Sequence, residues 1–258
     1  MKYGRIIMFC DYGLDDAIAT LHILRNAGMF GRIDIVPVGG NVPVDIAYPN
    51  AHTLLAAADA DINKVRIVDT RGIAQAAADI PDVHGKDGIG DVLSLAPSNA
   101  PVIAFDEYKN ELAKNGDPSV DCLLSLGPCT VPVLLGYMPE TIVVMGGTTL
   151  EPPNQGDYEF NECMDIAAFE TLAARATAVA TLDSCHDKKF DFDNMRFDDA
   201  LADKLLKKYV AMCKRRNAFV TVYDYVAALF VTDPALFAVH KTMRADGVEY
   251  NEIKLKRK

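Results

Sequence analysis

Short apolar runs alternate along the chain with segments of helical periodicity, and this alternation constrains the fold more than any other feature. Five apolar runs of strand length occupy Arg5–Cys10, Ile33–Val38, Val65–Val68, Val120–Leu126 and Thr141–Met145. Segments in which apolar residues recur every three or four positions separate or follow them, and the longest is Asp199–Arg215. Strands that alternate with helices form a mostly parallel sheet with helices on both faces. We therefore predict an α/β protein, a single domain over residues 1–258 with a central mostly parallel sheet flanked by helices.

The other predicted elements complete this pattern. Further helices are predicted over Asp15–Asn26, Asp45–Ala58, Asp106–Lys114, Val131–Tyr137, Ile166–Arg175 and Val222–Phe230. A strand is predicted at Ala178–Leu182, and the tail from Ala238 to Lys258 is typical of a hairpin that turns at Asp246-Gly247. Residues 70–105 and 147–158 are expected to form long loops. Because ligands of such folds bind at the carboxyl ends of strands, polar residues that follow the strands are the candidates for function.

Composition narrows the possible partners. The chain has 258 residues, of which 50% are hydrophobic, and its net charge of -10 disfavours nucleic acid. Its six cysteines are scattered without a CxxC pair, which favours reduced thiols over a zinc site or a disulfide framework. No signal peptide is visible, and no apolar stretch approaches the roughly 20 residues that span a membrane. We expect a cytoplasmic protein that binds a metal cation or a neutral small molecule.

Three carboxylates follow the first predicted strand, at Asp11, Asp15 and Asp16, with Gly13 expected to permit the tight turn between them. Helix capping explains one or two of them, because an acidic side chain at a helix start accepts hydrogen bonds from free N–H groups. Capping does not explain Asp11 at the strand end as well. Clustered carboxylates are usually neutralised by a divalent cation, and oxygen ligands favour Ca²⁺ or Mg²⁺ over zinc. We interpret the cluster as a metal site.

Other motifs that bind phosphate or carry an acidic nucleophile fit the sequence poorly. A phosphatase that forms an aspartyl-phosphate needs a second Asp two residues after the first, where this chain has Gly13. A Walker A loop is absent, and Val38–Val42 does not match a dinucleotide fingerprint, although its Asn41 is a polar contact. Thr130 and Met145 lie in ordinary turns after strands, and capping explains Asp224 at a helix start. Glu159 and Asn161 alternate with Phe160, so they are expected to share a face of an extended segment, and Asp165 is expected to be the N-cap of the helix that follows.

In their order and spacing these residues resemble the inosine–uridine nucleoside hydrolases, which cleave the N-glycosidic bond of ribonucleosides. The usual family motif is Asp-x-Asp-Pro-Gly-x-Asp-Asp-Ala, and residues 9–17 here are Phe-Cys-Asp-Tyr-Gly-Leu-Asp-Asp-Ala. Further matches follow in family order: VGGN ending in Asn41, NAHTLL at 50–55, HGKDGIG from His84, GPCT ending in Thr130, VMGG with Met145, EFNECMDIAA, LDSCH at 182–186 and YDYVAALFVTDP. The resemblance covers most of the chain and implies a single α/β domain with a mostly parallel sheet.

The resemblance also implies a role for individual residues. Ca²⁺ would be bound by Asp11, Asp16, Asp224 and the backbone carbonyl of Thr130. Asp11 would also be the general base for the attacking water. The substrate would be held by Asp15 and Asn161 at the ribose 2′- and 3′-hydroxyls, by Glu159 at the 5′-hydroxyl, and by Asn41, Met145 and His84. Family members are commonly dimers or tetramers, so a homodimer or homotetramer is expected.

The chain departs from the family pattern mainly near the leaving group. Phe9 replaces the first motif acid, Tyr12 the motif proline, and Tyr223 the histidine that is associated with protonating the leaving base. Tyrosine can donate a proton, but its ordinary pKa of about 10 makes it a weak acid at neutral pH. We expect Tyr12 to stand beside the site, where it would narrow the pocket or contact the substrate. The chain has no Trp and a reduced C-terminal part, so Tyr12, Tyr223, Tyr225 or Phe190 would have to stack on the base.

Three functions remain open from the sequence. The leading hypothesis is Ca²⁺-dependent hydrolysis of a common or modified ribonucleoside to ribose and free base, in purine or pyrimidine salvage, with Asp11 and Tyr223 as the catalytic residues. The substitutions at Phe9, Tyr12 and Tyr223 motivate an alternative, a catalytically weak ribose- or nucleoside-binding protein. A metal-dependent phosphohydrolase would need basic residues near the site, and Lys86 is one of few candidates.

Overall fold

The computed structural model describes residues 2–78, 80–244 and 246–256. Within them, one sheet contains β1 (Tyr3–Cys10), β2 (Phe30–Pro37), β3 (Val65–Asp69), β4 (Val102–Ala104), β5 (Asp121–Ser125), β6 (Thr141–Met145), β7 (Ala178–Ala180), β8 (Phe237–Met243) and β9 (Glu249–Leu255). The helices are α1 (Leu14–Arg25), α2 (Val44–Ala57), α3 (Pro81–His84), α4 (Phe105–Asn115), α5 (Thr130–Leu135), α6 (Phe160–Met164), α7 (Ile166–Ala173), α8 (Leu182–Cys185), α9 (Ala200–Arg215) and α10 (Tyr223–Thr232).

The strand order places the start of the chain in the middle of the sheet. The order is β4-β3-β2-β1-β5-β6-β7-β9-β8, and the paired strands run parallel except β8 and β9, which are antiparallel. Strands β2 to β4 lie on one side of β1, and β5 and the later strands lie on the other. The order therefore reverses between β1 and β5, which is the position where doubly wound sheets bind their ligands.

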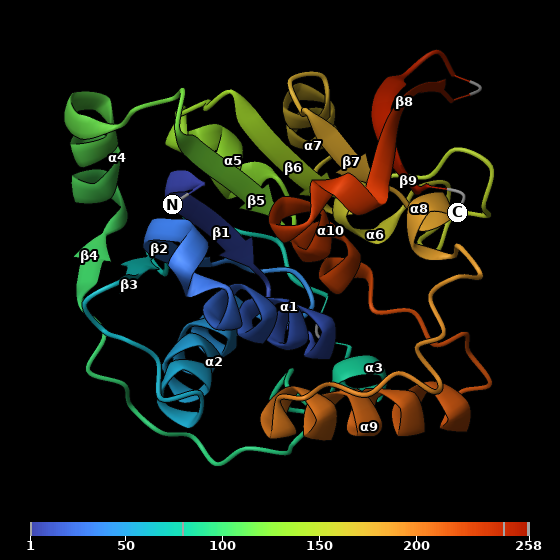
Figure 1. Cartoon of the computed structure of the whole chain (residues 1–258), viewed down its shortest axis with the longest axis horizontal. Coiled ribbons are helices and arrows are strands. Elements are labelled where there is room, and N and C mark those ends of the chain that lie inside the picture. The colour runs from blue at the N-terminus through green and yellow to red at the C-terminus, as the bar shows by residue number, and fades with distance from the viewer. Residues whose placement is uncertain (1, 79, 245, 257–258) are drawn as a thin grey trace.

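Two apolar cores lie on the two faces of this sheet. Ile6, Met8 and Cys10 of β1 belong to the core that also contains residues of α1, α2, α9 and α10, whereas Ile7 and Phe9 belong to the core with residues of α4, α5 and α7. Figure 1 shows α1, α2 and α9 on one side of the sheet and α5 and α7 on the other. Since both faces of β1 are buried, its sequence is a nearly continuous apolar run. Phe9, which replaces the first motif acid, is thus a packing residue.

The predicted α/β fold class is confirmed, and most predicted elements end within a few residues of the observed ones. The predicted loop at 70–105 is wrong in part, because it contains α3 and the edge strand β4. Helices α6 and α8 were also missed, since four or five residues are too few to show helical periodicity. The tail forms the predicted hairpin as β8 and β9, although Lys258 at its end lies outside the described residues.

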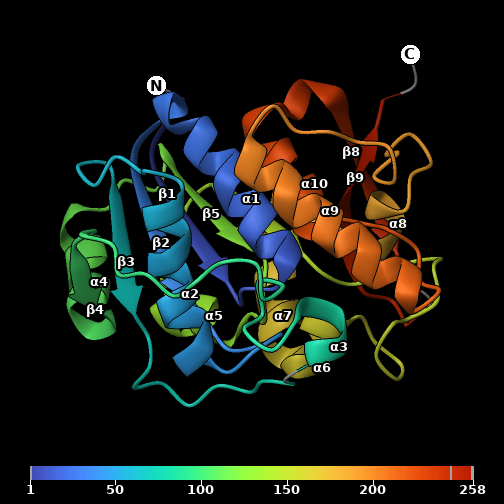
Figure 2. The same cartoon turned by 90° about the horizontal axis from the view of Figure 1, so that it is seen from below.

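The carboxyl ends of the central strands meet at one edge of the sheet. The residues that follow β1, β2, β5, β6 and β7 all lie at this edge, because these neighbouring strands run parallel. The view from below shows α9 alongside α1 (Figure 2). Of the helices that the structure describes, none is both long and apolar enough to span a membrane.

Candidate active site

The turn after β1 is organised by one of its own carboxylates. Asp16, in the first turn of α1, accepts hydrogen bonds from the backbone N–H of Asp11 at 3.1 Å and of Gly13 at 2.8 Å. Gly13 is the N-cap residue of α1, so Asp16 satisfies N–H groups that precede the helix. Capping therefore explains Asp16. It does not explain Asp11 and Asp15, which are also buried.

The residue with unusual backbone geometry in this turn is Tyr12 and not Gly13. Tyr12 has a φ of 44°, in the left-handed region, whereas Gly13 has a φ of -74° that any residue can adopt. The expectation that Gly13 supplies conformational freedom is thus wrong. Gly13 is required by space, because a Cβ there would lie 2.6 Å from Asn41 Nδ2 and 2.8 Å from His84 Cε1.

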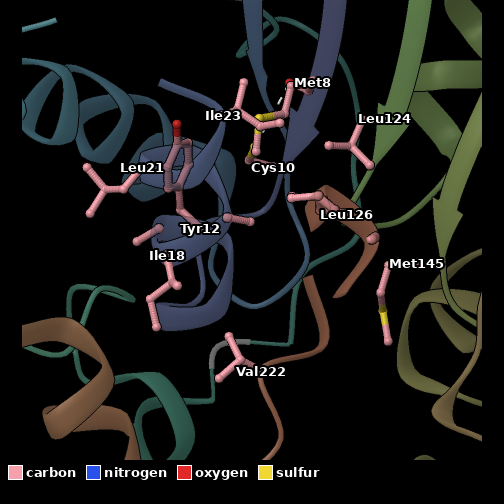
Figure 3. Packing of buried hydrophobic residues seen from close by; sticks show 14 of the residues in the cluster. Met8, Cys10, Tyr12, Ile18, Leu21, Ile23, Leu124, Leu126, Met145 and Val222 are labelled. Atoms are coloured by element: carbon pink, nitrogen blue, oxygen red, sulfur yellow. Dashed lines mark hydrogen bonds between the residues drawn. The ribbon is translucent and has the colours of Figure 1, made fainter. Parts of the chain in front are cut away.

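The expectation that Tyr12 contacts the substrate is also wrong. Its side chain is fully buried in the core on the α1 face of the sheet. Figure 3 shows the ring beside Ile18 and Leu21, directed away from Met145. The phenol thus fills core volume between β1 and α1, and the family proline is replaced here without narrowing the site.

Asn41, on the loop after β2, fixes the carboxylate of Asp11. Its backbone N–H donates to Asp11 Oδ2 at 2.8 Å and its side-chain Nδ2 donates to Asp11 Oδ1 at 3.0 Å. A Cβ on the preceding Gly40 would overlap the Asp11 carboxylate, so this glycine allows the loop to approach Asp11 closely. Both oxygens of Asp11 are therefore held in a defined orientation.

A second group of carboxylates is arranged as a cation site. Oxygens of Asp15, Asp16 and Asp224 lie within 4.8 Å of one another, and all three residues are buried. Asp15 Oδ1 has no hydrogen-bond partner within the described residues, although it is buried. Oxygen donors with one unpartnered atom fit a hard divalent cation, which would supply the missing positive charge.

This group differs from the ligand set implied by the resemblance. Asp16 and Asp224 belong to both sets, and the structure adds Asp15. Asp11 is not a member of the group but hydrogen-bonds to Asp16 through its backbone. Thr130, whose backbone carbonyl was predicted as a ligand, is the first residue of α5. Its hydroxyl donates to Asp165 Oδ2 at 2.7 Å, and this hydrogen bond holds Thr130 in place.

Crowding of buried carboxylates raises their pKa values. Burial and then repulsion from Asp11 raise the pKa of Asp15 to about 7, and burial and then repulsion from Asp15 raise that of Asp16 to about 6. Burial and then the charge of Asp16 also raise the pKa values of Asp11 and Asp224 well above the ordinary range of an aspartate. In the absence of a cation, these four groups repel one another, so a bound cation would stabilise their ionised forms.

A cavity of about 630 Å³ opens beside this cluster. It contains eight of the sequence-predicted residues, namely Asp15, Asn41, His84, Met145, Glu159, Asn161, Tyr223 and Asp224. The other three predicted residues, Asp11, Asp16 and Thr130, are not among its described lining residues. Lining residues that the sequence analysis missed include Tyr209, Arg216, Phe219, Phe160 and His186. Of the four predicted stacking residues only Tyr223 lines the cavity, because Tyr12, Tyr225 and Phe190 pack in the core.

Glu159 and Asn161 are presented by α6 rather than by an extended segment. Glu159 is the N-cap residue of α6, and its Oε2 accepts from the backbone N–H of Gly147 at 3.1 Å and of Glu162 at 3.2 Å. Asn161 Nδ2 donates to the carbonyl oxygens of Leu126 at 2.7 Å and of Met145 at 3.3 Å. These bonds use both amide hydrogens, so the side-chain oxygen is the group that Asn161 offers to a ligand.

His84, at the end of α3, is a neutral hydrogen-bonding group. Its Nδ1 accepts from the backbone N–H of Leu14 at 3.0 Å, which places the ring hydrogen on Nε2. Burial, with a smaller effect of Arg216, lowers its pKa to about 3. The ring stacks on Tyr209 of α9, with centroids 6.2 Å apart and planes inclined by 12°. His84 therefore offers a neutral N–H donor to the cavity.

Comparison with protein families decides the assignment. The model of the inosine-uridine preferring nucleoside hydrolases matches residues 6–254. The chain belongs to this family. Members are glycosidases that cleave the N-ribosyl bond, so this protein is an enzyme of the nucleoside hydrolase class and hydrolyses ribonucleosides.

Solved structures of nucleoside hydrolases share the fold at low identity. A plant nucleoside hydrolase, the PpNRh1 enzyme, has a TM-score of 0.72 at 20% identity, covering 99% of this chain and 87% of that one. An inosine-guanosine nucleoside hydrolase has a TM-score of 0.69 at 23% identity, covering 98% and 87% of the two chains. A purine-preferring ribonucleoside hydrolase from Gardnerella vaginalis has a TM-score of 0.68 at 19% identity, covering 98% and 88%. Among curated proteins, no sequence matches this nucleoside hydrolase.

On one wall of the cavity, this nucleoside hydrolase has three polar side chains in a row. Tyr223 Oη lies 2.9 Å from His186 Nε2, and His186 Nδ1 lies 3.3 Å from Glu151 Oε2. His186 follows α8, in the LDSCH segment, and Glu151 lies in the long loop before α6. Sequence reasoning quoted LDSCH as a family match but gave His186 no role, since no local signal shows that α8 lies against Tyr223.

Proposed function

We propose that this nucleoside hydrolase is Ca²⁺-dependent and uses Asp11 to activate water against the anomeric carbon of a ribonucleoside. The observation that supports the proposal best is the juxtaposition of a buried carboxylate cluster with a cavity lined by polar groups suited to a sugar. The site is assembled from several segments that lie between Asp11 and Asp224 in the sequence. This arrangement favours an enzyme over a binding protein that uses a single motif.

The cation would be held by Asp16 and Asp224, with Asp15 and Asp11 adjacent and the carbonyl of Thr130 as a further candidate ligand. When bound, Ca²⁺ lowers the pKa of a coordinated water and offers oxygen-rich coordination to hydroxyl groups. The all-oxygen donor set favours Ca²⁺ or Mg²⁺ over softer metals. Of these two, the flexible coordination of Ca²⁺ tolerates ligands from separate loops better.

The ribose would occupy the polar part of the cavity. Asp15 and the side-chain oxygen of Asn161 are hydrogen-bond acceptors for the 2′- and 3′-hydroxyls. Glu159 accepts from the 5′-hydroxyl, while Asn41, Met145 and His84 complete the contacts with the sugar. Negative charge near this position also stabilises an oxocarbenium-like transition state, because positive charge develops on the ribose as the bond to the base breaks.

Asp11 is the proposed general base. Its carboxylate is oriented by two hydrogen bonds from Asn41 and lies beside Asp16. It accepts a proton from the water that adds to C1′, and the electron pair of the broken N-glycosidic bond leaves with the base. The base departs toward the wall that contains Tyr223. Because Tyr223 replaces the family histidine on that wall, we propose that the substrate is a nucleoside with a modified or unusual base.

The variant Asp11→Ala tests the proposed base. Ribose release from inosine or uridine should fall by roughly 10²–10⁴-fold, the usual contribution of a general base. Its thermal unfolding midpoint should stay close to that of the parent, because a repelled buried charge has been removed. The matched control is Asp106→Ala on the exposed side of α4, which should retain activity. Unchanged turnover in Asp11→Ala would eliminate Asp11 as the base.

A panel of common and modified nucleosides, assayed with Ca²⁺ and after chelation, identifies the substrate. Release of ribose that depends on Ca²⁺ supports the proposal. Thermal stabilisation by nucleosides without any release would instead support the binding-protein alternative.

We also propose a cytoplasmic location, a role in nucleoside salvage and a homodimeric or homotetrameric assembly. The free thiols of Cys10, Cys122, Cys129, Cys163, Cys185 and Cys213 are compatible with a reducing compartment. Fractionation of the native protein with compartment markers, and its mass in solution, test these two proposals.

A further inference from the structure

A proton donated by the protein would promote departure of the base, and the expected family histidine is absent at position 223. Tyr223 lines the cavity and has a hydroxyl, but burial raises the pKa of this phenol above its ordinary value of about 10, so alone it is a poor acid near neutral pH. A phenol can still deliver a proton if another group replaces that proton at the same time. The structure has such a group directly behind Tyr223.

We propose that Glu151, His186 and Tyr223 form a proton relay that protonates the leaving base. Tyr223 Oη and His186 Nε2 are hydrogen-bonded at 2.9 Å, and Glu151 Oε2 lies 3.3 Å from His186 Nδ1, where it forms an ion pair when His186 is protonated. His186 also lines the cavity itself. The relay rests on the proposed function, because it serves the same bond cleavage.

The loop that carries Glu151 is fixed by the helix that precedes His186. The carboxylate of Asp183, in α8, accepts from the backbone N–H of Leu150 at 2.8 Å and of Glu151 at 3.0 Å. The backbone N–H of His186 in turn donates to Leu182, the first residue of α8, at 2.9 Å. One short helix thus positions both the imidazole and the loop from which Glu151 reaches it.

The same helix is also in contact with the start of α10. The thiol of Cys185 faces the backbone carbonyl of Tyr223 at 3.8 Å. Tyr223 and Asp224 are consecutive in α10, so the hydroxyl of the relay and a carboxylate of the proposed cation site share one rigid element. The relay is therefore set at a fixed position relative to the ribose subsite.

The proton balance of the step is complete. The N-glycosidic bond breaks with its electron pair on the nitrogen of the base, and the hydroxyl proton of Tyr223 passes to the base. The Nε2 proton of the imidazolium form of His186 replaces it, so Tyr223 is a neutral phenol before and after the step. The step requires the imidazolium form of His186, whose positive charge the carboxylate of Glu151, 3.3 Å from Nδ1, would stabilise. His186, whose side chain is 23% exposed, regains its proton from solvent.

In this relay, Tyr223 is the catalytic residue, and His186 and Glu151 are positioning residues that act through it. The test must therefore separate leaving-group protonation from folding and from sugar binding. A substrate whose leaving group departs without being protonated separates these effects, because its cleavage does not depend on the relay. The nitrophenolate of p-nitrophenyl β-D-ribofuranoside is stable as an anion, whereas the hypoxanthine of inosine is a poor leaving group unless protonated.

The experiment compares the two substrates in the parent enzyme and in His186→Gln, Tyr223→Phe and the double variant. With inosine, kcat should fall by about 10²-fold in each single variant, the lower range for a general acid. With the nitrophenyl riboside, kcat should remain close to that of the parent, which also demonstrates an intact fold. The double variant should lose little more than either single variant, because members of one relay act as a unit.

Two further variants bracket the result. Glu151→Gln keeps a hydrogen-bonding group but removes the charge, so it should show a smaller loss on inosine and none on the nitrophenyl riboside. His240→Gln changes an exposed histidine of β8 and should behave as the parent.

The outcomes distinguish failure of the relay from failure of the proposed function. If the parent cleaves both substrates and His186→Gln affects them equally, or affects neither, the relay is wrong. If the parent cleaves neither substrate with Ca²⁺ present, the proposed function fails and the relay fails with it.

Discussion

At the scale of single residues, space rather than conformational preference decides the β1–α1 turn. Tyr12 adopts the left-handed conformation, yet Gly13 is the residue that cannot carry a side chain. The turn is packed between Asn41 and His84, which come from separate loops. A local motif thus depends on contacts that the motif itself does not contain.

Gly13→Ala should disturb the site more than the fold. The new Cβ would lie 2.6 Å from Asn41 Nδ2 and 2.9 Å from Asp15 Oδ1, so these side chains must shift. We expect loss of most nucleoside hydrolysis and a loss of about 1–3 kcal/mol in the free energy of unfolding, the usual cost of overpacking. Steady-state kinetics and urea unfolding measure the two effects.

Gly28→Ala is the matched control, because a Cβ at Gly28 has no heavy atom within 4 Å. Its activity should equal that of the parent. Full activity in Gly13→Ala would show that the site tolerates the displacement.

Glu159 links residue chemistry to the pH dependence of stability. Burial raises its pKa from an ordinary 4.5 to about 7, despite hydrogen bonds from Asn161, Glu162 and Gly147 that lower it. The folded protein therefore binds more protons than the unfolded chain between these values. The stability that this group contributes is complete below pH 4.5 and is lost as the pH rises through about 7.

Glu159→Gln should remove this contribution, which is on the order of 3 kcal/mol. Urea denaturation with a chelator present gives the free energy of unfolding of the parent and the variant at about pH 5 and about pH 8. The contribution of Glu159 is the difference between the two proteins in how much this free energy changes with pH. The variant should lose less stability over this interval than the parent. Parallel pH profiles of the two proteins would contradict the assigned shift.

At the scale of elements, short helices place most of the site. Helices α3, α6 and α8 are four or five residues long, and each ends at or is flanked by a side chain with a proposed role, namely His84, Glu159 and His186. Such helices have no stability of their own and are held by contacts to neighbouring elements. Their positions thus depend on hydrogen bonds such as those of Asp183 and Asp165.

Asp165 tests this dependence, because it connects two helices. Its Oδ1 accepts from Ala168 N at 3.1 Å as the N-cap of α7, as the sequence predicted, and its Oδ2 accepts from the hydroxyl of Thr130 at 2.7 Å. Asp165→Ala should cost about 1–2 kcal/mol of unfolding free energy through the lost cap. Asp165→Asn should cost less, since it retains an acceptor. Denaturant unfolding measures both, and equal stability of all three proteins would contradict the capping role.

At the scale of the whole molecule, the sheet brings distant segments to one edge. Asp16 lies in α1, just after the central strand β1, and Asp224 lies in the first turn of α10. Although the two residues are far apart in the sequence, their oxygens lie close together at the proposed cation site. The repulsion among these buried carboxylates opposes folding, and a cation bound by the folded state alone reverses it.

Ca²⁺ should therefore raise the thermal stability of the protein. At a concentration about 100 times its Kd, binding contributes about 2.7 kcal/mol. For a chain of this size each kcal/mol corresponds to about 2–4 °C in Tm. Differential scanning calorimetry with Ca²⁺, with Mg²⁺ and after chelation measures the shift. Asp224→Asn should abolish most of it, and an identical Tm under all conditions would argue against a cation site.

Much of this protein could be predicted from its sequence. Apolar runs such as Arg5–Cys10 indicate strands buried on both faces, so the parallel α/β fold followed from their alternation with helical segments. Asp11, Asp15 and Asp16 follow a strand directly, and the spacing of the other motifs indicated the family. These features are local, because strand and helix periods and strand-end positions depend on neighbouring residues.

Only the tertiary structure decided which distant side chains meet. It placed Tyr12 in the core, gave Gly13 a steric role, and added Asp15 to the carboxylate group of Asp16 and Asp224. It also set His186 between Glu151 and Tyr223. Such contacts depend on how short helices and loops pack across the sheet edge, and no spacing within one segment carries that information.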